Sequence, residues 1–224
     1  MRDTLTMFHT AESNRALFGA LVAELAPDVP VAHIVDTGAL QEVCACGVVT
    51  PSLRRKVCET LLGALDRGAR AVLCTCSSLG AITAVAAQLT ERPVLRIDRP
   101  MAEEAVARGS LIIVAATLPT TLQPTRDLIL EAAHEANKEV AVIDLLCHRA
   151  WARFEAGDQE GYLDEIAAQL RRNASRGDVL VIAQASMARA IDRCPELALP
   201  VLTSPRSGLA AAIRAYREAS PVVD

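Results

Sequence analysis

The chain has 224 residues, of which 51% are apolar and 22% charged, and its formal net charge is -4. This length and apolar content suffice to bury a sizeable core without disulfide support. The basic residues come only in short runs, at 54–56 and 171–172, so the chain has no broad cationic face and nucleic acid is not an expected partner.

The sequence has no segment typical of a membrane or secreted protein. No apolar stretch reaches the roughly 20 residues of a membrane-spanning helix, and the first residues lack the apolar segment of a secretory signal. We therefore expect a cytoplasmic protein with no membrane partner. Seven cysteines are an odd number for a disulfide framework, and we expect them to be reduced. Aromatic residues make up only 3% of the chain, which favours a small polar substrate.

Short runs rich in Val, Ile and Leu alternate with longer amphipathic segments. In chain order, the runs predict strands at 5–9, 31–35, 71–75, 94–97, 111–115, 140–145, 179–183 and 201–203. The amphipathic segments predict helices at 14–25, 52–66, 102–108, 124–136, 163–172 and 208–218. Alternation of this kind indicates βαβ units, and continuously apolar strands indicate parallel sheets covered on both faces.

The two halves of the chain look like repeats. When residue 10 is laid on residue 117, strand ends coincide, and the turn Cys76–Ser78 falls on Gln184–Ser186. We expect an α/β fold of two pseudo-symmetric, four-stranded parallel lobes, 1–100 and 101–206, with 207–224 returning to the first. Ligands of such sheets bind beyond the carboxyl ends of the strands, so we expect a cleft between the lobes there. The alternative is two unrelated βαβ runs of similar length.

Cys76 follows a predicted strand and precedes a predicted helix start, which makes it a candidate reactive thiol. A helix N-terminus favours thiolate over thiol; a thiolate removes a proton and a thiol returns one. Ser77 and Ser78 can cap the helix and donate to a substrate carboxylate. The alternative is a buried structural cysteine. Cys74, two residues earlier, is expected in the core.

The corresponding turn of the second half carries Gln184 where the first has a thiol. An amide is no base, but it can hold a substrate oxygen or an enolate by hydrogen bonding. Ser186 can donate to a carboxylate. The alternative for Gln184 is a helix-capping residue.

Two further strand ends carry hydroxyl groups. Thr10 follows the first strand, and Thr117 and Thr120 follow the fifth. Short hydroxyl side chains with exposed backbone N–H groups can form a carboxylate cradle, although turn and cap roles explain them as well. His9, beside Thr10, is the one histidine at a predicted strand end and is a candidate substrate contact and proton carrier.

We expect no metal and no cofactor. Cys44 and Cys46, with Cys74 and Cys76, could in principle form a four-thiolate zinc site, but each pair is separated by one residue and one pair lies on a predicted strand. The sequence contains no glycine-rich phosphate loop, serine nucleophile elbow or HExxH pattern.

Three segments make the chain resemble the aspartate/glutamate/hydantoin racemase superfamily over essentially its whole length: Val72–Ser78, Ala116–Thr120 and Val181–Ser186. The resemblance implies a two-lobed, cofactor-free enzyme, and homodimers are common in this superfamily. In its members two cysteines face each other across the lobe interface, one removing the α-proton and the other delivering one. It also implies that Ser77, Ser78, Thr117, Thr120 and Ser186 contact the carboxylate or amine of the substrate.

The sequence departs from that superfamily pattern at Gln184, which replaces the second cysteine. The expected function is a racemase, epimerase or isomerase acting at the carbon next to a carboxylate of a small amino or dicarboxylic acid, with Cys76 as acid/base or nucleophile. The superfamily also includes cofactor-free malonate decarboxylases and maleate cis–trans isomerases, so a decarboxylase stays open. Two further alternatives are a non-catalytic protein that binds a small carboxylate and a purely structural role.

Overall fold

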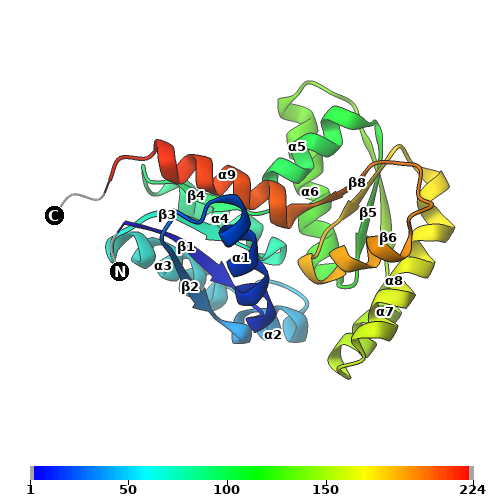
Figure 1. Cartoon of the computed structure of the whole chain (residues 1–224), viewed down its shortest axis with the longest axis horizontal. Coiled ribbons are helices and arrows are strands. Elements are labelled where there is room, and N and C mark those ends of the chain that lie inside the picture. The colour runs from blue at the N-terminus through cyan, green and yellow to red at the C-terminus, as the bar shows by residue number, and fades with distance from the viewer. Residues whose placement is uncertain (1–2, 222–224) are drawn as a thin grey trace. The chain divides into compact units, whose positions relative to one another are not determined.

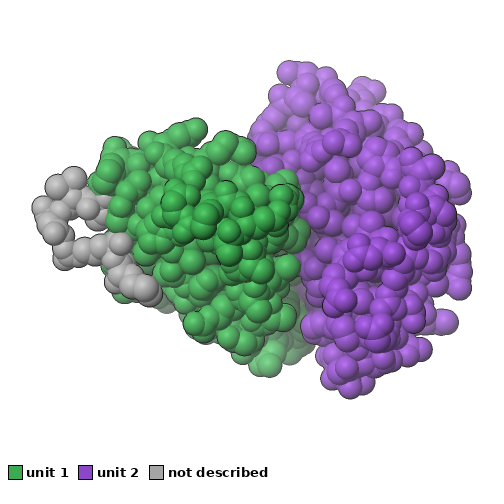
Figure 2. Space-filling view, viewed as in Figure 1, with its two compact units in different colours: residues 1–97, 205–224 green, residues 98–204 purple. Residues whose placement is uncertain are grey.

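The structure, a computed structural model, describes residues 3–221. It contains two four-stranded sheets in which every strand pairing is parallel, each with helices on both faces (Figure 1). The predicted α/β fold class is therefore confirmed. Within the described residues, unit 1 takes the chain up to Ile97 and again from Pro205, and unit 2 is Asp98–Ser204 (Figure 2).

Unit 1 contains the strands in the order β2-β1-β3-β4. They are β1 (Thr4–His9), β2 (Val31–Val35), β3 (Ala69–Cys74) and β4 (Val94–Arg96). One face of this sheet packs on α1 (Glu12–Leu25) and α9 (Ser204–Glu218), which supply Phe18, Leu209 and Ile213 to a core with Leu5 and Leu73. The other face packs on α2 (Thr37–Cys46), α3 (Pro51–Asp66) and α4 (Gly80–Gln88), after the short 3₁₀ helix η1 (Ser77–Leu79).

Unit 2 repeats this strand order as β6-β5-β7-β8. Its strands are β5 (Leu111–Ala116), β6 (Ala141–Leu146), β7 (Val179–Ile182) and β8 (Val201–Thr203). The helices α5 (Arg99–Arg108) and α6 (Pro119–Glu135) cover one face. The other face packs on α7 (His148–Glu155), α8 (Gln159–Asn173) and the 3₁₀ helix η3 (Ala185–Arg193), with η2 (Ala174–Arg176) after α8. The shared strand order supports the repeat that the sequence suggests.

Three helices, α2, α4 and α7, lie outside the six predicted segments, although a helix start was expected after Cys76. Helix α2 is capped at its start by Asp36, whose carboxylate accepts from the Ala39 N–H at 3.2 Å, and is followed by Gly47, whose φ of 71° is left-handed. An aspartate N-cap and a glycine after the last turn are ordinary helix boundary signals. Their spacing in the sequence could therefore have predicted this helix.

The start of α6 was predicted at residue 124, and this prediction is wrong. The helix begins at Pro119 and includes Pro124. Proline suits the first helical position, but at an interior position it removes the N–H that would bond four residues back. Here that missing partner belongs to the Thr120 carbonyl, in the first turn, where the cost to the helix is smallest. Across residues 3–221, no helix is long and apolar enough to cross a bilayer.

Candidate functional site

Cys76 lies two residues beyond the carboxyl end of β3, in the turn that leads to α4. Strand β1 pairs with β3 in the register Phe8 to Cys74, so the next residues on that side, Thr10 and Cys76, are neighbours at the edge of the sheet. The Thr10 hydroxyl hydrogen-bonds to the Cys76 thiol, and so do the hydroxyl and backbone of Ser78 and the backbone of Leu79. The sulfur thus lies among several hydrogen-bonding groups from two segments.

Burial is the dominant influence on this thiol. It raises the pKa of Cys76 above its ordinary value, and the surrounding hydrogen bonds lower the pKa without cancelling that effect. The preference for thiolate that is expected near a helix N-terminus therefore does not outweigh burial at Cys76. The segment after Cys76 is the single turn η1, and α4 begins only at Gly80, so the helix end acts from a distance. The resting group is a protonated thiol whose neighbours can stabilise the thiolate after the proton leaves.

The other side of Cys76 is apolar. Its side chain belongs to a buried cluster with Phe8, Cys74 and Leu79, and the residue is 8% exposed. Cys74 is fully buried in that cluster, as predicted. Ser77 and Ser78 are also buried, and neither η1 nor α4 has a side-chain N-cap hydrogen bond. The N-cap positions of η1 and α4 are Cys76 and Leu79, so neither serine occupies the N-cap position of a helix.

His9 lies on the opposite face of the unit 1 sheet from the thiol, fully buried against Phe18. Its Nδ1 is 2.9 Å from Thr75 Oγ1, and its Nε2 is 2.9 Å from His33 Nδ1. Burial, with smaller effects from His33 and Arg15, lowers the pKa of His9 to about 4. Both ring nitrogens are occupied within unit 1, so we place His9 behind the Cys76 turn and not among substrate contacts.

In unit 2, Gln184 follows β7 and is anchored by Thr117. The Gln184 side-chain oxygen accepts from the Thr117 backbone N–H at 2.6 Å and from the Thr117 hydroxyl at 2.9 Å. Gln184 makes no capping bond to η3, which removes the alternative of a helix cap. Since its oxygen is occupied, Gln184 presents its NH₂ group, and it can act only as a hydrogen-bond donor.

Two further predicted site residues of unit 2 are Ser186, in η3, and Thr120, in the first turn of α6. The Ser186 hydroxyl lies 2.8 Å from the hydroxyl of Tyr162, a fully buried residue of α8. Burial raises the pKa of Tyr162, while hydrogen bonds with Ser186 and Thr117 lower it. The Thr120 hydroxyl oxygen is buried and has no hydrogen-bond partner within residues 3–221. The sequence did not indicate Tyr162 as a site residue, because a tyrosine at an apolar position of an amphipathic helix is an ordinary core residue.

The cysteines do not form a metal site in the part of the chain that the structure describes. All seven are free thiols, with Cys44 and Cys46 exposed on α2. Residues 3–221 contain no group of three or more His, Cys, Asp or Glu side chains that could hold a metal ion.

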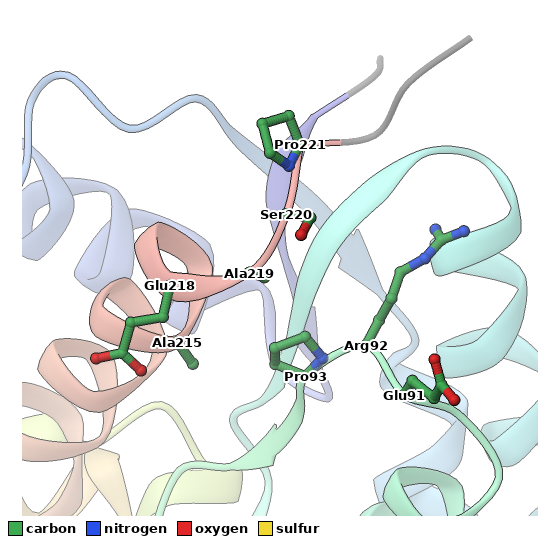
Figure 3. Close-up of a pocket in the computed structure, with 8 residues that line it drawn as sticks. All are labelled: Glu91, Arg92, Pro93, Ala215, Glu218, Ala219, Ser220 and Pro221. Carbon is green, nitrogen blue, oxygen red and sulfur yellow. The ribbon is translucent and has the colours of Figure 1, made fainter.

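Figure 3 shows a pocket of about 540 Å³ in unit 1 whose lining residues do not include Cys76. Pro93, in its wall, precedes β4, so this pocket is at the amino end of the parallel sheet, whereas Cys76 is at the carboxyl end. Its arginine, Arg92, donates to the backbone oxygen of Leu65 at 2.6 Å. The cation therefore holds the fold together, and we do not assign this pocket to the site.

No model of a protein family matches the chain, and no curated protein matches its sequence. Solved structures do match it. Glutamate racemase from Bacillus anthracis aligns with a TM-score of 0.71 at 15% identity, covering 96% of this chain and 82% of that one. Aspartate racemase from Picrophilus torridus aligns with a TM-score of 0.70 at 12% identity, covering 98% and 96%.

An unliganded arylmalonate decarboxylase is also similar, with a TM-score of 0.55 at 16% identity, covering 97% of this chain and 94% of that one. At such low identities the likeness shows the fold. The chain therefore has the fold of these racemase structures, as its sequence resemblance implied.

Proposed function

We propose that this chain is a cofactor-independent isomerase or racemase that transfers a proton at the carbon next to a carboxylate of a small amino or dicarboxylic acid. One observation carries the proposal: a thiol at a strand end, held by hydroxyl and backbone groups of Thr10, Ser78 and Leu79, in a fold shared with racemases. A structural cysteine packed only in hydrocarbon has no need of these hydrogen-bonding groups.

Cys76 is the acid/base group of the proposed reaction. As an acid, its S–H gives the proton to the α-carbon of an enolate, and the electron pair of the S–H bond stays on sulfur as thiolate. The surrounding hydrogen bonds stabilise that thiolate. As a base, Cys76 first gives its S–H proton to solvent; the thiolate then takes the α-proton, and the C–H electron pair moves into the enolate. Racemisation then requires return of a proton to the opposite face of the carbon from a second donor.

Gln184 is proposed as a hydrogen-bond donor to the carboxylate or enolate. Its orientation supports this role, because Thr117 occupies its oxygen and leaves the NH₂ group to donate. A donor aimed at developing negative charge is worth about 10²- to 10³-fold in rate in comparable sites. Ser77, Ser78, Thr120 and Ser186 stay candidates for further contacts with the substrate.

The test is α-proton exchange. Candidate amino, hydroxy and dicarboxylic acids are incubated with the protein in deuterated water and followed by NMR, with Cys76→Ala and the matched control Cys46→Ala. We expect deuterium at the α-carbon with wild type and with Cys46→Ala, and none with Cys76→Ala. Wild-type exchange rates in the Cys76→Ala protein would remove the assignment.

A cofactor-free decarboxylase of a malonate-type acid is the second candidate, and two observations favour it. The resting thiol is protonated, and Gln184, which is no acid/base group, stands at the position of the second cysteine. Loss of CO₂ leaves an enolate that needs one proton, which one thiol supplies. Release of CO₂ in the same NMR experiment identifies this reaction. Saturable binding of a carboxylate without exchange or CO₂ identifies a binding protein instead.

A further inference from the structure

Two histidines form a hydrogen-bonded stack behind the Cys76 turn. The His9 and His33 rings stack with centroids 5.2 Å apart, and His9 Nε2 lies 2.9 Å from His33 Nδ1. On the other side of the ring, His9 Nδ1 lies 2.9 Å from the hydroxyl of Thr75. Thr75 in turn is bound to the carbonyl oxygen of Phe8 through its hydroxyl, at 3.1 Å, and through its backbone N–H, at 2.9 Å.

Counting hydrogen bonds shows which atoms donate and which accept in this series of three side chains. If Thr75 donates to the Phe8 carbonyl, its oxygen accepts from His9 Nδ1–H, and His9 Nε2 accepts from His33 Nδ1–H, which makes three hydrogen bonds. If instead His9 carries its proton on Nε2, Thr75 must turn its only hydroxyl proton to His9 Nδ1, and two bonds result. A buried hydrogen bond is favourable, so the structure favours the Nδ1–H form of His9.

This hydrogen-bonded series of His33, His9 and Thr75 is joined to the residues that hold the Cys76 sulfur. Thr75 immediately precedes Cys76, and Thr10, whose hydroxyl bonds the thiol, immediately follows His9. Successive residues of a strand point to opposite faces, so His9 and Thr75 meet on the α1 face while Thr10 and Cys76 meet on the α4 face. We propose that His9, as a neutral Nδ1–H donor, is a positioning residue that clamps the β1 and β3 turns together and so fixes the Cys76 sulfur.

The direction of this hydrogen-bonded chain requires a neutral His9. A proton on His9 Nε2 would face the His33 Nδ1–H and force His33 to move its own proton to Nε2, although the His9 Nδ1–H bond to Thr75 would remain. The charged and titratable groups that act on the pair are His33 on β2 and Glu12 and Arg15 on α1. Burial and Arg15 lower the pKa of both histidines, which keeps His9 neutral at ordinary pH.

The first test is the tautomer, read from the ¹⁵N shifts of the imidazole nitrogens at neutral pH, with His9 assigned by its absence in His9→Asn. We expect a protonated Nδ1 and an unprotonated Nε2. A protonated Nε2 would overturn the proposed direction of the chain. This measurement needs no substrate, and its result does not depend on whether Cys76 is catalytic. The inference rests on the proposed function only where it assumes that the sulfur held by the clamp is a catalytic one.

The second test measures alkylation of individual cysteines by iodoacetamide, using peptide mass spectrometry. Asparagine at position 9 can replace the Nδ1–H donor, whereas glutamine reaches only the Nε2 side; Thr75→Ser keeps the acceptor and Thr75→Val removes it. Loss of the clamp should raise the Cys76 rate about tenfold in His9→Gln and Thr75→Val, since one buried hydrogen bond is worth about that factor. His9→Asn and Thr75→Ser should stay within about threefold of wild type.

Cys74, fully buried at the end of β3 and two residues before Cys76, is the internal control. General unfolding would expose Cys74 together with Cys76, whereas loss of the clamp should expose Cys76 alone. Equal rates for His9→Asn and His9→Gln, or a parallel rise at Cys74, would overturn the proposal. Once a substrate is known, His9→Gln and Thr75→Val should lower kcat and leave KM within about twofold, because His9 does not contact the substrate.

Discussion

Burial is the main influence on the pKa values of four buried side chains in this protein. Cys76, Cys147 and Tyr162 have raised pKa values and His9 a lowered one, and in each case desolvation is the largest cause. Position along the sequence predicted which residue stands at each strand end. It could not predict these shifts, because the atoms that bury Cys76 and His9 come from α1, β2 and η1 as well as from their own strands.

Cys147 gives a prediction for alkaline pH. Burial, and to a lesser degree Glu165, raises its pKa to about 12. The unfolded chain, with a thiol pKa near 8.5, therefore ionises first, and the free energy of unfolding falls as the pH rises from about 8.5 towards 12. Cys147→Ala should remove about 2 kcal/mol of the loss between pH 8 and pH 10, measured by urea unfolding. The exposed residue Cys46 supplies the control, and an equal change in Cys46→Ala would contradict this origin.

His9 gives the opposite dependence on pH: in the acid range, the free energy of unfolding rises as the pH rises. Its folded pKa of about 4 lies below the unfolded value near 6.5, so the unfolded chain binds the proton first. Its contribution to stability is complete above pH 6.5 and is lost as the pH falls towards 4. Between pH 7 and pH 5 the loss should be on the order of 2 kcal/mol in wild type. His9→Asn, which cannot titrate, should show a flatter acid profile; an unchanged slope would mean that other groups dominate.

At the scale of elements, apolar periodicity predicted all eight strands to within about two residues, because a doubly covered parallel strand is apolar throughout. It predicted six helical segments and missed α2 and α7, and of α4 it gave only the start, after Cys76. Helix α7 buries only Ala150, so its amphipathic signal reflects one narrow contact over eight residues. The candidate turns at Cys76 and Gln184 were found because strand ends fix them. The bond between Gln184 and Thr117 was not, since it depends on where the β5 end lies beside β7.

Helix α9 depends on close approach at Gly208. A Cβ placed there would lie 2.1 Å from the Ile97 carbonyl oxygen, a backbone atom that cannot rotate away. Gly208→Ala should therefore lower the free energy of unfolding by about 2 to 3 kcal/mol. Gly19 in α1 has open space within 4 Å of the position that a Cβ would take, and Gly19→Ala should raise stability by about 0.5 to 1 kcal/mol. Similar effects of the two substitutions in thermal unfolding would contradict this packing.

At the scale of the whole molecule, each unit has its own core on both sides of its sheet. Leu209 is fully buried in unit 1 and Leu170 in unit 2. Truncating either to alanine should cost about 2 to 5 kcal/mol, and the loss of amide protection in hydrogen exchange should concentrate in its own unit. Equal loss in both units after Leu209→Ala would show that the two cores unfold as one.

The path of the chain through the units also sets an order of assembly. Unit 2 is one continuous segment, whereas the core of unit 1 needs α9, which follows unit 2 in sequence. During translation, all of unit 2 is synthesised before Leu209 and Ile213 are added to the chain. The nascent first half must therefore wait with one apolar face of its sheet only half covered, a period in which a chaperone has a surface to hold.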